Sequence, residues 1–168
     1  MSDRTTQRGF SLTELMITLV VLAVVTGIGV PSLRQMIEAN RADTYATQLL
    51  GSLKLARSEA MKRGAPITIC ASANGETCGD DWARGWVVRD EDNEVLDRTL
   101  IGEGKLMVSA GSVVELEFNV RGGIETESAD KMEKIALAGG DTDRVTRELT
   151  IGEAGVIGLE KKPKNENK

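Results

Sequence analysis

The chain has 168 residues, which is about the length of one domain. It contains 21 Lys and Arg against 26 Asp and Glu, a formal net charge of −5, with two cysteines and no histidine. Histidine is the commonest general base and metal ligand, so its absence excludes the nucleophile systems and zinc sites that depend on it. We find no constellation of catalytic residues and expect a protein that is not an enzyme and binds no cofactor.

An apolar segment follows a short polar start. The first nine residues include Arg4 and Arg8, and the next 24, Phe10 to Leu33, contain one charged residue, Glu14. As a helix this segment would extend about 36 Å, enough to span the hydrocarbon core of a bilayer. A cleaved secretory signal fits poorly, because the run is long and no A-x-A-like site follows it. An ordinary signal anchor explains the hydrophobicity and the flanking arginines, but not a carboxylate in the apolar run.

The residues around that carboxylate form a specific motif, Arg8-Gly9-Phe10-Ser11-Leu12-Thr13-Glu14-Leu15. The motif resembles the prepilin peptidase site of type IV pilins and type II secretion pseudopilins. The resemblance implies that residues 1–9 are a leader, that cleavage falls between Gly9 and Phe10, and that the new N-terminal Phe10 is N-methylated. It also implies that Glu14 pairs with the N-terminal ammonium of an adjacent subunit, and a carboxylate held in a membrane needs such a partner.

Two glycines and a proline interrupt the second half of the apolar segment at Gly27, Gly29 and Pro31. On general grounds these residues are kink points in a helix. They also resemble the stretch in which pilin helices bend or locally melt when they pack in a filament. We expect residues 10–33 to form the transmembrane and filament-core part of the helix.

The next segment, residues 34–64, is expected to continue the helix as an amphipathic stem. Gly64 followed by Pro66 is a helix stop. Apolar residues recur in the stem at i, i+3, i+4, i+7 spacing: Ala42, Tyr45, Ala46, Leu49, Leu53, Ala56 and Ala60. Such a stripe is typical of core packing rather than of a ligand groove.

Beyond the stem the hydrophobic pattern changes to period two or to short apolar runs. We expect strands at residues 66–70, 85–89, 94–96, 114–120, 134–137, 148–151 and 156–159. In the clearest of them, alternation places Val114, Leu116, Phe118 and Val120 on one face. The predicted fold is therefore α+β, with one long helix packed on a small antiparallel β-sheet head at residues 65–160. Residues 161–168 are polar and are predicted to be a disordered tail.

A wider resemblance is carried by short stretches of the stem and the head: Asn40-Arg41, Ala56-Arg57-Ser58-Glu59-Ala60, Lys62-Arg63-Gly64, Cys70-Ala71-Ser72, Trp82 and Gly85-Trp86-Val87-Val88. From Arg8 to about Val88, and more weakly at Phe118 to Gly122, the chain resembles the GspH/FimT family of type IV minor pilins and type II secretion minor pseudopilins. The resemblance implies the type IV pilin fold.

The function implied by the resemblance is that of a minor pilin. Such a protein is inserted in the inner membrane by one span, with its head in the periplasm, and is then incorporated into a type IV pilus at the cell surface. There it would help to prime assembly at the pilus tip. The implied partners are the prepilin peptidase, the inner-membrane assembly platform, and other minor and major pilins. A type II secretion minor pseudopilin is the alternative.

The two cysteines fit a periplasmic head, because that compartment is oxidising. Cys70 and Cys78 are predicted to form a disulfide that closes a short loop. The chain-entropy model values such a bridge at about 2.5 kcal/mol. Two unpaired thiols are the alternative, and a redox role is disfavoured because the spacing is not C-x-x-C.

The charge is unevenly distributed along the chain. Residues 34–63 have six Lys and Arg against three Asp and Glu, whereas residues 76–153 have nine against nineteen. Some members of the family bind DNA through a Gly-Arg-x-Arg-like segment near the C-terminus. The corresponding residues 152–158 lack those arginines and include Glu153. Because non-specific DNA binding needs positive charge, a DNA-receptor function is disfavoured.

A few lysines close to the C-terminus form the basic cluster nearest to that segment: Lys161, Lys162, Lys164 and Lys168. Their composition fits a solvated tail. One acidic cluster in the head, with carboxylates at residues 90, 92, 94 and 97, has a spacing that Ca²⁺ can use. The EF-hand glycine and terminal glutamate are absent, and a solvated hairpin turn explains the cluster equally well. We expect no metal site.

Overall fold

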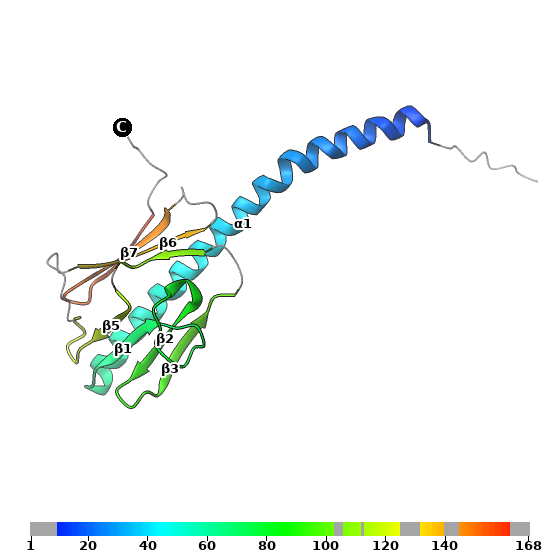
Figure 1. Ribbon diagram of the computed structural model, residues 1–168. Coiled ribbons are helices and arrows are strands. Elements are labelled where there is room, and N and C mark those ends of the chain that lie inside the picture. The colour runs from blue at the N-terminus through cyan, green and yellow to red at the C-terminus, as the bar shows by residue number, and fades with distance from the viewer. Residues whose placement is uncertain (1–9, 103–105, 112, 125–131, 140–144, 162–168) are drawn as a thin grey trace, which may run out of the picture. The chain divides into compact units, whose positions relative to one another are not determined.

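The computed structural model describes residues 10–102, 106–111, 113–124, 132–139 and 145–161 (Figure 1). The chain divides into two compact units, Met1–Met36 and Ile37–Lys168. The predicted leader, with Gly9, and residues 162–168 of the predicted tail lie outside the described residues.

In the first unit the structure consists of the N-terminal part of helix α1 (Leu12–Arg63). The Ser11 hydroxyl oxygen accepts a hydrogen bond from the backbone N–H of Glu14 at 3.2 Å, which is the geometry of a helix N-cap. The helix is long and apolar enough to cross a membrane, with a mean hydropathy of 2.2 over its most apolar window, none of which is buried.

The predicted interruptions lie within that helix. Pro31 is inside α1, and the helix runs through Gly27 and Gly29 as well. At both glycines a Cβ atom would find open space. Bending or melting at these three positions in a filament stays a prediction.

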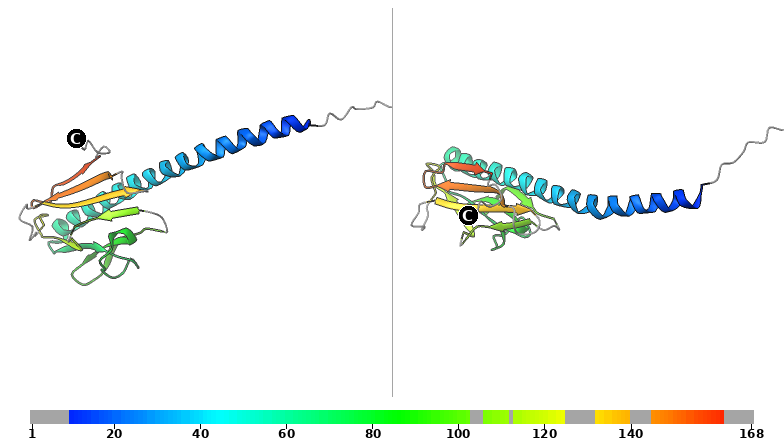
Figure 2. Two further views of the ribbon diagram at one scale, coloured as in Figure 1. Left: turned by 45° about the horizontal axis from the view of Figure 1, so that its top comes forward. Right: turned by 90° about the horizontal axis from the view of Figure 1, so that it is seen from above.

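The second unit contains the rest of α1 and two four-stranded antiparallel sheets, with strand orders β3-β2-β1-β5 and β4-β6-β7-β8. The elements are β1 (Ile67–Ala71), the 3₁₀ helix η1 (Trp82–Arg84), β2 (Gly85–Asp90), β3 (Val95–Leu100), β4 (Leu106–Ser109), β5 (Glu115–Phe118), β6 (Met132–Gly139), β7 (Val145–Gly152) and β8 (Ile157–Glu160). In Figure 2 both sheets lie on the same side of this part of the helix.

The predicted apolar stripe of the stem forms the centre of the core. Its alanines and leucines are fully buried: Ala42, Ala46, Leu49, Leu53, Ala56 and Ala60. Side chains from both sheets pack into the same hydrophobic cluster, including Ile69 and Phe118 from the first and Ile135 and Leu149 from the second. The helical period thus buries one stripe of α1 under two sheets at once.

The stem ends where its sequence predicts. The last helical residue is Arg63, and Gly64 follows with φ +66°. The Gly64 N–H donates to the carbonyl of Ala60 at 3.0 Å. This left-handed cap suits glycine, since a side chain would strain the backbone there.

The head differs in three respects from the expectation. It contains two sheets rather than one, and β4 was not predicted, because a four-residue run is too short to show a period. The strand expected at residues 114–120 is shorter. Of the four residues expected on one face, Leu116 and Phe118 are buried, but Val114 and Val120 are 46% and 47% exposed. The Asn119 side chain stops the strand by accepting hydrogen bonds from two backbone N–H groups of the following turn.

Candidate assembly site and the head that carries it

The residues of the prepilin motif lie at the start of α1. Phe10 precedes the helix and is 82% exposed, while Glu14 lies in its first turn and is also exposed. Ser11 to Glu14 has the S-x-x-E spacing of a capping box, and the Ser11 hydroxyl also lies 3.0 Å from that of Thr13. The cap holds Phe10 outside the helix. Sequence reasoning missed the role of Ser11, although its spacing from Glu14 is the signal that could have revealed it.

The stem residue Arg57 joins the helix to both sheets. Its Nε donates to the carbonyl of Gly122 at 2.9 Å, and its Nη2 donates to the carbonyl of Ala154 at 3.1 Å. Gly122 belongs to the turn after β5, and Ala154 to the turn between β7 and β8. A single guanidinium therefore fixes one turn from each sheet against α1. The stretch Ala56–Ala60 suggested a family resemblance, but nothing in the sequence predicted this contact.

The two turns also touch each other. Gly155 has φ +69°, and a Cβ atom there would overlap the carbonyl of Gly122. The backbone N–H of Ile124 donates to the carbonyl of Glu153 at 2.9 Å. Residues 152–158, the segment in which DNA-contacting arginines were sought, therefore contain a tight turn between β7 and β8 that packs against the turn after β5.

The predicted disulfide is present. Cys70 and Cys78 are bonded, with their Cα atoms 5.5 Å apart. Side chains order the loop between them: the Ser72 hydroxyl donates to the carbonyl of Thr77 at 2.7 Å, and Asn74 Oδ1 accepts from the N–H of Glu76 at 2.9 Å. The bridge therefore closes a loop that its own hydrogen bonds also hold in place.

The carboxylates of the acidic cluster serve the hairpin and the core. Asp90 Oδ1 accepts from the backbone N–H groups of Asp92 and Glu94, which builds the β2–β3 turn. Asp97 Oδ2 accepts from the Ser52 hydroxyl at 2.6 Å, and that hydroxyl accepts from Trp86 Nε1 at 3.0 Å. In the described parts of the chain, no three His, Cys, Asp or Glu side chains gather where they could hold a metal ion.

Several charges of the stem are paired within the head. Arg147 forms two hydrogen bonds to the carboxylate of Asp43, at 2.9 and 3.2 Å. Arg63 contacts both Glu59, at 2.7 Å, and Asp90, at 3.2 Å. The hydrogen bond from Arg63, followed by that from Lys62, lowers the pKa of Glu59, and the same bond to Glu59 raises the pKa of Arg63.

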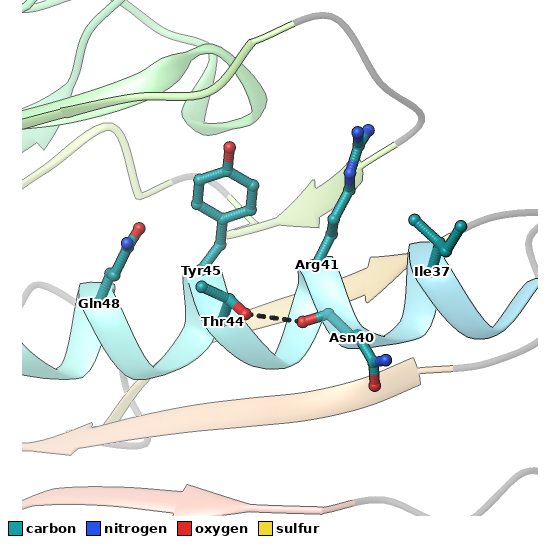
Figure 3. Close-up of a pocket in the computed structure, with 6 residues that line it drawn as sticks. All are labelled: Ile37, Asn40, Arg41, Thr44, Tyr45 and Gln48. Carbon is teal, nitrogen blue, oxygen red and sulfur yellow. Dashed lines mark hydrogen bonds between the residues drawn. The ribbon is translucent and has the colours of Figure 1, made fainter. Parts of the chain in front are cut away.

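A shallow groove of about 340 Å³ runs along the exposed side of the stem (Figure 3). In that view the side chains of Arg41 and Tyr45 rise from the helix on the same side, while the Thr44 hydroxyl bonds to the carbonyl of Asn40 at 2.9 Å. A second groove of about 420 Å³ shares Thr44 and Gln48 with it. These grooves are surfaces for contact rather than enclosed ligand sites.

Comparison with known protein families assigns most of the chain to one family. The family described as "Type II transport protein GspH" matches residues 45–155, about two thirds of the sequence. The chain belongs to the GspH family. A second family, the prokaryotic N-terminal methylation motif, matches residues 4–30 of this GspH family member. The family predicted from the sequence is therefore confirmed.

Solved structures show that this GspH family member has the pilin fold. The type IV minor pilin FimU of Pseudomonas aeruginosa is 24% identical and aligns with a TM-score of 0.57 over 74% of this chain and 92% of FimU. The minor pseudopilin EpsH of the Vibrio cholerae type 2 secretion system is 16% identical, with a TM-score of 0.51 over 71% of this chain and 96% of EpsH. No curated protein matches the chain significantly.

These comparisons confirm the α+β fold class, with a long N-terminal helix and antiparallel sheets. They also give the class of function. A GspH family member associates with other pilins or pseudopilins during assembly. Its methylation motif and apolar helix indicate anchoring in a membrane.

Proposed function

We propose that the chain is a minor pilin that is incorporated into a type IV pilus and helps to prime assembly at the pilus tip. It would be inserted in the inner membrane by Phe10 to Leu33, with its head in the periplasm. The observation that carries the proposal is the order of parts in one chain. A methylation motif leads directly into a helix of membrane length, and a GspH head follows.

The first step is processing by a prepilin peptidase. The peptidase would hydrolyse the bond between Gly9 and Phe10, and the new α-amino group of Phe10 would then be methylated. The Ser11 cap supports this step, because α1 begins at Leu12 and Phe10, on one side of that bond, lies outside the helix. In this scheme the chain is a substrate and not an enzyme.

The second step is docking at the inner-membrane assembly platform. Glu14 is the only charged residue from Phe10 to Leu33, and its carboxylate is exposed on the first turn of α1. In a low-dielectric environment it would attract the terminal ammonium of an adjacent pilin strongly. That pairing would set the axial register of the incoming subunit.

A type II secretion minor pseudopilin is the second candidate, and the fold likeness to EpsH supports it. A DNA receptor for uptake is disfavoured on two grounds. The head is acidic, and the turn at residues 152–158 is packed against Gly122 and Arg57 rather than presenting arginines.

Mass spectrometry of the mature protein tests the processing step. We expect a chain that begins at methylated Phe10, and an intact leader or another start would overturn the proposal. Sheared pili should contain the protein, and its deletion should reduce piliation. A secretion defect with normal piliation would instead favour the pseudopilin.

Replacement of Glu14 tests the docking step. A Glu14→Ala variant should insert in the membrane at the wild-type level but enter filaments poorly, because the ammonium of the adjacent subunit would lose its partner. Immunoblots of the membrane and sheared-pilus fractions measure what share of the inserted protein enters filaments. Normal incorporation of this variant would remove the pairing role.

A further inference from the structure

The edge strands of the two sheets differ in how well they are protected. They are β3 and β5 in the first sheet and β4 and β8 in the second. The ladder between β2 and β3 shifts register, Ile124 bridges to the end of β5, and η1 lies close to β4. Charged side chains lie along β3 and β5, namely Asp97, Arg98, Glu115 and Glu117. Irregular ladders, charges and covering segments keep a sheet edge from pairing with another chain.

Strand β8 has almost none of this protection. It is the outermost strand of the second sheet, drawn in red in Figure 2. Its ladder with β7 runs without a register shift, and its first three residues, Ile157, Gly158 and Leu159, carry no charge. Among the residues that the structure describes, no strand pairs with its outer side. We call this outer side of β8 the open edge.

The turn into β8 decides which backbone groups the open edge presents. The Gly152 N–H donates to the carbonyl of Val156 at 3.0 Å, so these two residues form a hydrogen-bonded pair. In an antiparallel ladder such pairs alternate with pairs that share no hydrogen bond. The N–H and C=O groups of Ile157 and Leu159 therefore point away from β7. A chain in extended conformation satisfies groups arranged in this way.

The core-facing side chains of β8 add an apolar requirement. Ile157 and Leu159 are partly buried and pack against the hydrophobic cluster of the core. Opposite them on β7 lie Ile151 and Leu149, which are fully buried. Burial of this layer thus decreases from β7 to β8. An added strand with apolar residues facing Ile157 and Leu159 would extend the layer by one strand.

The other face of β8 adds a charge requirement. Glu160 is exposed and lies directly opposite Glu148 of β7. Like charges in this position destabilise a sheet, whereas opposite charges on neighbouring strands stabilise it. A basic residue in the added strand, next to Glu160, would supply the opposite charge.

A second copy of this chain does not fit the open edge. Antiparallel pairing of two β8 strands places a two-fold axis perpendicular to the sheet. Because the stem packs along the sheets, that axis would reverse the direction of the second stem. Two chains anchored in one membrane, with their heads on the same side, need stems that run in the same direction. The partner is therefore a different protein.

We propose that the open edge binds an extended segment of another subunit of the assembly, which adds a strand to the second sheet. The segment pairs with the backbone of Ile157 and Leu159. It carries apolar residues at alternate positions and a Lys or Arg beside Glu160. The inference rests on the proposed function, because the partner is a component of the same filament, and it adds the docking surface and the chemistry of the docked segment.

A strand supplied by the chain itself tests the inference. In the full-length protein, residues 162–168 are replaced by Asn-Gly-Thr-Lys-Val-Thr-Val. Asn-Gly favours a two-residue hairpin turn, which places the two valines opposite Leu159 and Ile157 and the lysine opposite Glu160. Hydrogen exchange at the amides of Ile157 and Leu159 should slow by about tenfold or more in detergent. Incorporation into sheared filaments should fall by about tenfold or more, because a tethered strand competes at a high effective concentration.

The matched control has the tail Asn-Gly-Thr-Lys-Pro-Thr-Pro. Proline lacks the N–H groups that would bond to the open edge. We expect wild-type exchange and wild-type incorporation of this variant. The Tm of both tail variants should equal or exceed that of the wild type, which excludes a folding defect.

Replacement of Glu160 tests the charge requirement. Glu160→Lys should reduce incorporation, since the basic residue of the partner would then meet a like charge. Glu115→Lys is the control, at an exposed carboxylate of the other sheet, and should assemble normally. Equal incorporation of these two variants would overturn the pairing at Glu160.

Wild-type incorporation of the valine-tail variant would overturn the inference, as would unchanged amide exchange in it or an equal loss with the proline tail. Each of these results leaves the proposed function intact. Absence of the wild-type chain itself from sheared filaments would overturn the proposed function, and the inference with it. The two failures are therefore distinguishable in one experiment.

Discussion

Helix α1 is built from two regions that handle apolar residues in opposite ways. In the region up to Leu33 the apolar side chains are exposed, among them Leu22, which is 58% exposed. In the stem the apolar side chains lie on one stripe, and Leu49 and Leu53 are fully buried under the two sheets. The first region therefore depends on surroundings that the chain does not supply, whereas the stem finds its partner within the chain.

Truncation of a leucine in each region should give the largest difference. Leu53→Ala should lower the free energy of unfolding of the head by about 2–5 kcal/mol, because it leaves a cavity in the core. Leu22→Ala should leave head unfolding nearly unchanged. Urea unfolding in detergent, followed by the fluorescence of the two tryptophans in the head, measures both variants. Equal losses of stability in the two variants would contradict the conclusion that only the stem's leucines stabilise the head.

Removal of the disulfide should have the next largest effect. The variant Cys70→Ala with Cys78→Ala should lose about 2.5 kcal/mol of stability, because its unfolded chain is no longer constrained. Its membrane insertion should be unchanged, since the bridge lies in the head. Wild-type protein unfolded under reducing conditions is the control, and an unchanged urea midpoint in both would refute the stabilising role.

Loss of the Arg57 side chain tests the attachment of the two turns to the stem. Arg57→Met keeps much of the apolar stem of the side chain but leaves the carbonyls of Gly122 and Ala154 without this donor. We expect a loss of about 2 kcal/mol. The control is Lys54→Met, at an exposed residue of the same helix. This variant should lose less than about 0.5 kcal/mol in its free energy of unfolding. If both variants unfold alike, the guanidinium does not hold the turns.

The ion pairs of Glu59 should give the smallest effect, and one that depends on pH. Hydrogen bonds from Arg63 and Lys62 lower the pKa of Glu59 below its ordinary value of 4.5. The folded form therefore gains stability above pH 4.5 and loses it as the pH falls through the lower folded pKa. Glu59→Gln should unfold with a weaker dependence on pH below 4.5. An unchanged pH profile would show that these exposed pairs contribute nothing measurable.

Much of this protein could be predicted from local signals. The prepilin motif needs only eight consecutive residues, the buried stripe needs only a helical period, and Gly64 with Pro66 ends the stem. The disulfide followed from the expected compartment, and its partners lie eight residues apart. Each of these features depends on residues that are close in sequence, so a pattern or a propensity suffices to find it.

Other features depend on contacts between distant residues. Strand β4 and the division of the head into two sheets follow from pairing partners such as Leu106 with Gly139, which no local pattern specifies. The same holds for Asp97, whose acidic cluster fits a solvated hairpin turn by sequence, but whose carboxylate accepts a hydrogen bond from Ser52 on the helix. The alternating pattern at residues 114–120 identified the buried side chains only within β5, at Leu116 and Phe118.

The sequence by itself determined the class of protein, the long helix with its apolar half, and the motif at Phe10. These depend on composition and on periodicity along one element. Only the tertiary structure decided that Arg57 holds a turn from each sheet and that Asp43 on α1 pairs with Arg147 on β7. Both outcomes depend on which side of α1 the sheets cover, and the apolar stripe of the stem, which is buried under both sheets, decides that side.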